Sequence, residues 1–135
     1  MATPFKLRIL SPDKIFYDGE TERIITRTTV GEVGILANHE PYCAALTIGK
    51  LRVFVDGAYK NAAISSGVIR VVKGGETLIL AQSIEWCEDI DVDRANRAKA
   101  SASKRLADAG KDAHAADIAE FKLKRALNRL ETAQL

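Results

Sequence analysis

The first 84 residues contain short runs in which apolar and polar side chains alternate. Phe5, Leu7 and Ile9 alternate with Lys6 and Arg8, and a period of two residues is typical of a strand with one buried face. Six further short runs, many of them rich in β-branched residues, continue the pattern: residues 14–17, 22–29, 51–55, 58–64, 68–72 and 77–82. Each run predicts a short strand.

Glycine-containing turns separate these runs. Asp56-Gly57 lies between residues 51–55 and 58–64, and it is a strong hairpin signal because a type I′ turn needs positive φ at both central residues. Gly74-Gly75 marks a second turn. Many short strands without helices between them predict an antiparallel β-sandwich or flattened barrel over residues 1–86.

The period changes after Asp91, where a helical pattern begins. Asp91 is placed to cap the first turn of a helix, and Gly110 is placed to end it. The apolar positions of this helix are Val92, Ala95, Ala98 or Lys99, Ala102 and Leu106. Because alanine favours a helix but buries little apolar surface, we expect the hairpin to be held only loosely against the sandwich.

A second helix is predicted to open at Asp112 or Asp117 and to run nearly to the end of the chain. Its predicted apolar stripe consists of Ile118, Phe121, Leu123 or Ala126, Leu127 and Leu130. A turn of five or six residues around positions 108–113 makes the two helices antiparallel. Residues 87–135 therefore predict a helical hairpin that follows the sandwich.

Composition and charge limit the classes of partner that we expect. The chain has 135 residues, of which 47% are hydrophobic, and a formal charge of +2, which is too small to favour nucleic acid as the main partner. The hairpin carries the positive charge, and this suits a nucleotide or an acidic protein surface. No apolar run is long enough to span a membrane, so we expect a soluble cytoplasmic protein. Cys43 and Cys87 are expected to be reduced, buried thiols.

Three arginines of the hairpin are candidates for binding phosphate. Arg125 and Arg129 are four residues apart and share a helical face, while Arg94 lies one turn inside the start of the other helix. Guanidinium groups bind phosphate through paired hydrogen bonds, and a helix N-terminus offers free N–H groups. The alternative is a solvated basic face that pairs with Asp93, Asp117 and Glu120. Lys73-Gly-Gly-Glu-Thr77 lacks the pattern of a phosphate-binding P-loop, which argues against ATP hydrolysis.

Several motifs together resemble the epsilon subunit of bacterial F-type ATP synthases. They are Gly31-Glu-Val-Gly-Ile35, His39-Glu-Pro41, Ser65-Ser66-Gly67, Leu78-Ile-Leu-Ala-Gln82, the box Ile90-Asp-Val-Asp-Arg-Ala95 and Leu123-Lys-Arg-Ala-Leu-Asn-Arg-Leu130. Each motif is weak alone, but their order and spacing over nearly the whole chain are specific. Ser66 departs from the family pattern, which has glycine at this position, and this puts the local turn geometry in doubt.

The resemblance implies a non-catalytic rotor subunit with two functional regions. The matching residues Glu85, Ile90, Asp91, Arg94, Ala95, Arg125 and Arg129 imply an ATP-binding site, without hydrolysis and without an obligatory metal. Glu32 lies in a loop that is implied to face the membrane c-ring, and His39 is implied to lie at the interface with the gamma subunit.

The resemblance also implies regulation of ATP hydrolysis at the cytoplasmic face of the bacterial membrane. The hairpin would inhibit the alpha and beta subunits of the catalytic head when extended, and bound ATP would favour its compact state. The alternative is a free-standing β-sandwich and hairpin that senses ATP and regulates another enzyme.

Overall fold

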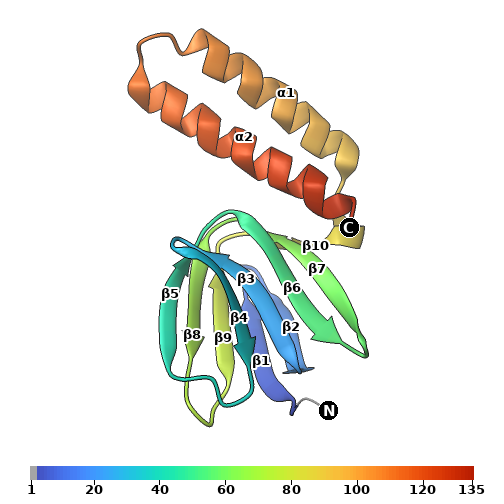
Figure 1. Cartoon of the computed structure of the whole chain (residues 1–135). Helices are drawn as coiled ribbons and strands as arrows, with labels where there is room; N and C mark the ends of the chain where they lie inside the picture. Colours follow the sequence, from blue (N-terminus) through green and yellow to red (C-terminus); the bar gives the residue numbers. More distant parts are fainter. Residues whose placement is uncertain (1–2) are drawn as a thin grey trace. The chain divides into compact units, whose positions relative to one another are not determined.

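The computed structural model describes residues 3–135. They form two compact units, one that ends at Trp86 and one that comprises Cys87–Leu135. The first unit is built of strands and the second of helices (Figure 1). The ten strands are β1 (Phe5–Leu10), β2 (Ile15–Thr21), β3 (Arg23–Thr28), β4 (Gly31–Leu36), β5 (Tyr42–Leu46), β6 (Gly49–Val55), β7 (Ala58–Ile64), β8 (Gly67–Val71), β9 (Thr77–Ala81) and β10 (Ile84–Trp86). The predicted combination of a sandwich and a helical hairpin is confirmed.

The strands form one sheet that curls into two facing layers (Figure 1). Their order is β10-β7-β6-β3-β5-β8-β9-β1-β2, and β4 pairs with the other edge of β3. The first and last strands of this order meet through side chains, because the rings of Phe16 on β2 and Trp86 on β10 stack with centroids 4.4 Å apart. The Thr21 hydroxyl also donates to the Phe54 carbonyl on β6 over 2.7 Å. These contacts nearly close the barrel.

One strand pair departs from the predicted antiparallel arrangement. Strand β1 pairs in parallel with β9, with Leu7 opposite Thr77 and Leu10 opposite Leu80. All other strand pairs in the described chain are antiparallel. A parallel pair needs a long connection, and here the chain between the two partners contains strands β2 to β8.

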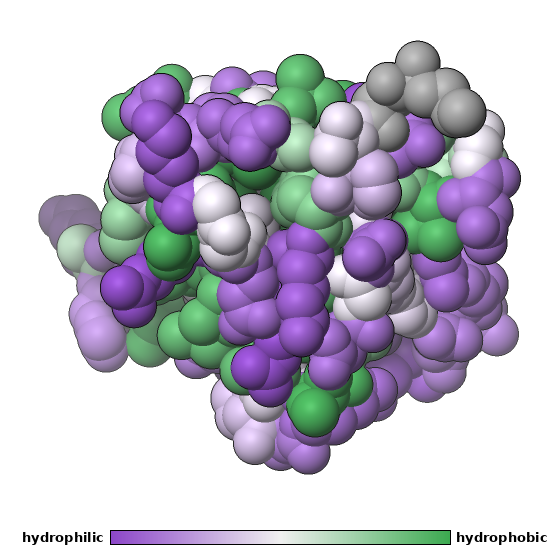
Figure 2. Space-filling view, turned by 90° about the horizontal axis from the view of Figure 1, so that it is seen from below, coloured by the Kyte–Doolittle hydropathy of each residue, from purple (hydrophilic) through white to green (hydrophobic). Residues whose placement is uncertain are grey.

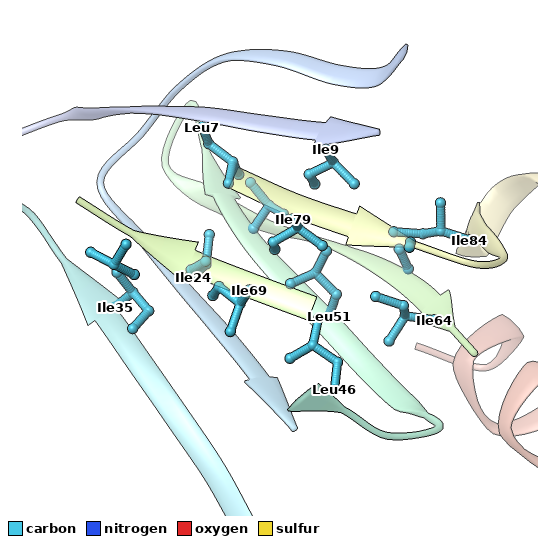
Figure 3. Packing of buried hydrophobic residues seen from close by; sticks show 14 residues of the cluster. Leu7, Ile9, Ile24, Ile35, Leu46, Leu51, Ile64, Ile69, Ile79 and Ile84 are labelled. Atoms are coloured by element: carbon cyan, nitrogen blue, oxygen red, sulfur yellow. The ribbon is translucent and has the colours of Figure 1, made fainter. Parts of the chain in front are cut away.

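Fourteen buried residues form the core between the layers (Figure 3). Leu7 and Ile9 of β1, which the alternating pattern predicted to face inward, are fully buried together with Ile24, Ile69 and Ile79. These side chains come from strands of both layers, as the labelled sticks in Figure 3 show. Burial of β-branched residues from both sides stabilises the sandwich as a single unit.

The two predicted turns are confirmed by their backbone angles. Asp56 and Gly57 have φ of 51° and 83°, as a type I′ turn between β6 and β7 requires. Gly74 has φ of 72°, and the Gly75 N–H donates to the Val72 carbonyl over 3.0 Å in the turn between β8 and β9.

The second unit contains a short 3-10 turn, η1 (Cys87–Asp89), and the helices α1 (Val92–Asp108) and α2 (Ala113–Ala133). Asp91 caps α1, and Asp112, one of the two predicted openings, caps α2. Gly110 has φ of 57° just beyond α1, as a helix-ending glycine should. Four residues, 109–112, separate the helices, which is slightly fewer than predicted.

The interior of the hairpin is lined with alanine. Ala95 and Ala102 of α1 and Ala119 and Ala126 of α2 are buried. Counted from the loop 109–112, Ala102 and Ala119 are each seven residues away and Ala95 and Ala126 are each fourteen away. Two levels of facing alanines therefore allow the helices to approach closely.

The predicted stripe of large apolar residues on α2 is mostly wrong. Ile118 and Phe121 are 44% and 43% exposed, and Leu127 is also exposed, while Leu123 and Leu130 are half-buried. Because the partner helix presents alanine methyls, the small side chains of α2 occupy the centre of the contact. The larger ones lie at its margin or outside it.

Candidate functional site

The start of α1 is organised by Asp91. Its carboxylate accepts a hydrogen bond of 3.0 Å from the backbone N–H of Arg94, which satisfies one of the free donors at the helix N-terminus. Ile90 just before it is buried, and its N–H donates to the Cys87 carbonyl over 3.4 Å. Ala95 is fully buried. Within this box, Asp91 shapes the backbone, whereas the Arg94 side chain is exposed.

The hairpin brings the three candidate arginines within about one helical turn of one another along its axis. Arg94 lies fifteen residues before Ala109, while Arg125 and Arg129 lie thirteen and seventeen residues after Asp112. At about 1.5 Å of rise per residue, Arg94 falls midway along the axis between the other two, roughly 3 Å from each level. The three arginines therefore lie near the same end of the hairpin, and their convergence on one set of phosphates stays a prediction.

Arg125 and Arg129 are more constrained than Arg94. Both are half-buried, and the guanidinium carbon of Arg125 lies 5.8 Å from the centre of the Phe121 ring. Arg129 also has an interaction partner. A guanidinium held against a ring loses less freedom when it binds an anion, because part of its orientation is already fixed.

Glu85 stands apart from the other six predicted ATP-binding residues. It lies on β10 in the sandwich unit, opposite Ala63 of β7, whereas Ile90, Asp91, Arg94, Ala95, Arg125 and Arg129 all lie in the hairpin unit. Glu85 already has an interaction partner in the structure.

The expected loop around Glu32 is a strand. Glu32 is the second residue of β4, directly opposite Arg27 of β3, and it is exposed. Two glycines in Gly31-Glu-Val-Gly-Ile-Leu36 weaken the strand signal, which explains the wrong prediction. Strand β5 was also missed, since its run of alanines carries little strand signal, and so was the three-residue β10.

His39 lies in the connection between β4 and β5. Its Nδ1 lies 2.7 Å from the Glu40 carbonyl oxygen, and its ring meets the Tyr42 ring edge to face. It lines a hollow of about 470 Å³ with Thr3–Lys6, Leu36–Asn38, Val71–Val72 and Gly74–Thr77. Figure 2 views the molecule from below, where hydrophobic residues are interspersed among hydrophilic ones on the surface.

The outer face of one layer carries a row of apolar residues that the sequence pattern did not predict. Ala45, Val68, Leu80, Leu10 and Ile15 lie opposite one another in turn across β5, β8, β9, β1 and β2. Val68, Leu80 and Ile15 are 42%, 48% and 59% exposed. We call these five residues the apolar row. The sequence could not reveal it, because the strand register that aligns the five residues is not visible in the strand pattern.

Both units of the chain match known protein families. Residues 4–87 match the family described as "ATP synthase, Delta/Epsilon chain, beta-sandwich domain", and residues 88–134 match "ATP synthase, Delta/Epsilon chain, long alpha-helix domain". The chain belongs to the ATP synthase epsilon chain family. The two matches meet close to the boundary between the two compact units.

Relatives of this epsilon chain match it along most of its length. The "ATP synthase epsilon chain" of Ruminococcus albus is 44% identical over 129 residues, which is 96% of each chain. A chain in "Cryo-EM structure of Euglena gracilis mitochondrial ATP synthase, OSCP/F1/c-ring in rotational state 1" is 26% identical, with a TM-score of 0.82, and the alignment covers 97% of this chain and 81% of that one. The "ATP synthase epsilon chain, sodium ion specific" of Acetobacterium woodii is 39% identical over 109 residues, covering 80% of this chain and 81% of that one.

Further features of this epsilon chain concern metal, membrane and thiols. Residues 3–135 contain no cluster of three or more His, Cys, Asp or Glu side chains that could hold a metal ion. No helix in that range is both long and apolar enough to cross a bilayer.

Both cysteines are free thiols, but Cys43 is exposed and Cys87 is half-buried, so the prediction that they are buried is wrong for Cys43.

Proposed function

We propose that this epsilon chain is a non-catalytic rotor subunit that couples the catalytic head of an F-type ATP synthase to its membrane ring. In this role the sandwich binds the gamma subunit and the c-ring, at the cytoplasmic face of the bacterial membrane. Its apolar row offers a continuous surface across five strands, and exposed apolar surface of this kind marks protein contacts. Glu32 on β4 faces the c-ring, and His39 belongs to the gamma interface.

The hairpin regulates ATP hydrolysis through two states. In one state it is compact and permissive, and in the other it extends along gamma and inhibits the alpha and beta subunits. Lys99, Lys104 and Arg105 on α1 are exposed, as are Lys122 and Lys124 on α2, and they suit acidic surfaces of those subunits.

ATP is the ligand that favours the compact state, and it is bound without being hydrolysed. The observation that supports this proposal is the gathering of Arg94, Arg125 and Arg129 at one level of the hairpin, beside the N-terminus of α1. A ligand shifts an equilibrium only by binding one state more tightly. ATP therefore acts if the hairpin arginines bind it more tightly in the compact state than in the extended one.

The test is calorimetric titration of the full chain with ATP, with and without magnesium. Arg125→Ala removes a charge-assisted contact worth about 1.5–3 kcal/mol, so we expect the affinity to fall roughly ten- to hundredfold. In the assembled complex, the same variant should be inhibited more strongly at a given ATP concentration, because the compact state loses its ligand.

Lys111→Ala is the control, since Lys111 is an exposed cation in the loop between the helices. It should leave both ATP affinity and inhibition nearly unchanged. If Arg125→Ala binds ATP as tightly as the wild-type chain, the arginines are a solvated basic face and the regulatory proposal is wrong. Failure of the gamma subunit to co-purify with the chain in stoichiometric amounts would instead contradict the rotor role.

A further inference from the structure

The outer face of the other layer carries two arginines packed against two aromatic rings. Arg23 of β3 lies with its guanidinium carbon 4.1 Å from the centre of the Phe54 ring and 5.3 Å from that of Tyr59. Arg52 of β6 lies 4.6 Å from the centre of the Tyr59 ring. We call Arg23, Arg52, Phe54 and Tyr59 the arginine–aromatic face.

Strand register places these residues side by side. Phe54 pairs with Tyr59 across β6 and β7, and their rings meet edge to face at 5.2 Å. Arg52 pairs with Ile25, two residues beyond Arg23 on β3. Alternate residues of a strand point to the same face, so both guanidinium groups lie on the side of the layer that faces away from the core.

Hydrogen bonds fix the inner end of each guanidinium. The Arg23 Nε donates to the Tyr59 hydroxyl over 2.7 Å, and the Arg52 Nε donates to the Asn61 side-chain oxygen over 3.2 Å. Each guanidinium has five N–H donors, and these bonds use one of them. Within the described sandwich, residues 3–86, neither arginine forms an ion pair with a carboxylate.

From this arrangement we infer that the arginine–aromatic face is a docking surface for paired carboxylates of a second protein subunit. Two oriented guanidinium forks with unused terminal donors match carboxylates that bind in a bidentate manner. Arginine and tyrosine are also the residues most often found at energetic centres of protein interfaces. Arg27 adds positive charge further along β3, although Glu32 of β4 lies opposite it.

The shape of the surface favours a protein over a small anion. Small ligands bind in concave pockets, and the hollow described at the end of the sandwich is lined by none of these four residues. The arginine–aromatic face lies instead on an open sheet surface formed by β3, β6 and β7. It is distinct from the apolar row, which lies on strands β5, β8, β9, β1 and β2.

The experiment uses the cognate F-type complex stripped of its epsilon subunit, so it rests on the proposed rotor function. Wild-type chain and the double variant Arg23→Gln/Arg52→Gln are titrated into this complex at low and high salt. We expect the variant to bind roughly ten- to hundredfold more weakly at low salt, because it loses charge-assisted hydrogen bonds. The difference should shrink at high salt, where charges are screened.

Two further variants keep the test decisive. Lys14→Gln/Lys111→Gln removes the same charge from two exposed positions and should bind as the wild type does. Arg23→Lys/Arg52→Lys keeps the charge but loses the planar fork, and it should also bind more weakly. If the glutamine variant fails to fold by circular dichroism, the lysine variant decides, and unchanged binding by it overturns the inference.

The remaining outcomes separate the two proposals. If wild type binds the stripped complex and the glutamine variant binds within twofold of it, the docking inference is wrong while the rotor function stands. If wild type does not bind, the rotor function itself is wrong. If sodium tripolyphosphate binds the free chain at micromolar concentration and only when Arg23 and Arg52 are intact, the surface is a small-anion site and the inference is also wrong.

Discussion

Ser66 and Gly67, at the start of β8, both occupy positions that suit glycine, but for different reasons. Ser66 has φ of 70°, a left-handed conformation that costs an L-residue roughly 1–2 kcal/mol and suits glycine. Gly67 has no room for a side chain, because a Cβ there would collide with the backbone carbonyl oxygen of Leu80. Glycine would therefore fit the backbone at position 66 without strain, and the adjacent Gly67 is sterically required.

This contrast gives a paired prediction for stability. Ser66→Gly should raise the free energy of unfolding by about 0.5–1 kcal/mol, since relief of the left-handed strain exceeds the added chain entropy. Gly67→Ala should lower it by about 1–3 kcal/mol through overpacking. Chemical denaturation of both variants measures the two effects. A loss of stability in Ser66→Gly would show that the bond from its hydroxyl to Gln82 Oε1 outweighs the strain.

At the level of secondary structure, the helix ends and turns were the most predictable features. Asp91, Gly110, Asp56 and Gly57 each act through their own backbone or side chain, so the sequence alone identified their positions. The exposed stripe on α2 was mispredicted because facing alanines, rather than the pattern of one helix, decide what is buried. The apolar row and the arginine–aromatic face were not predicted either, because the pairing register between strands brings their residues together and single strands do not show it.

The helix caps provide a test at this level. Asp112→Ala removes the side chain that accepts from the Ala115 N–H over 3.1 Å, so α2 should lose about 0.5–2 kcal/mol of stability. Asp117→Ala is the matched control, because Asp117 is exposed inside α2 and does not cap it. Thermal unfolding followed by far-ultraviolet circular dichroism measures both. Equal losses in the two variants would contradict the assigned start of α2.

For the whole molecule, the two units differ in the size of the groups they bury. The sandwich core contains isoleucine, leucine and valine from both layers, whereas Ala95, Ala102, Ala119 and Ala126 are the apolar residues buried within α1 and α2. Each buried CH₂ contributes about 0.8 kcal/mol, so an alanine gains far less than an isoleucine. The hairpin is therefore the less stable unit.

Hydrogen exchange should reveal this difference. We expect amides of α1 and α2 to open with lower free energy than those of β1, β6 and β9, because local opening follows the number of buried apolar groups. Mass spectrometry of peptides from residues 5–81 and 92–133 measures the two rates. Equal protection across both ranges would mean that the hairpin does not open separately.

The parallel pairing of β1 with β9 has a consequence for synthesis on the ribosome. Strand β1 leaves the ribosome before β9, because its partner residues Thr77–Leu80 are translated about 70 residues later. At about 5–20 residues per second, this delay lasts several seconds. During that time Leu7 and Ile9 have no β9 to pair with and are open to wrong strand pairing. The native pairing of β1 with β9 can therefore form only after most of the sandwich has been synthesised.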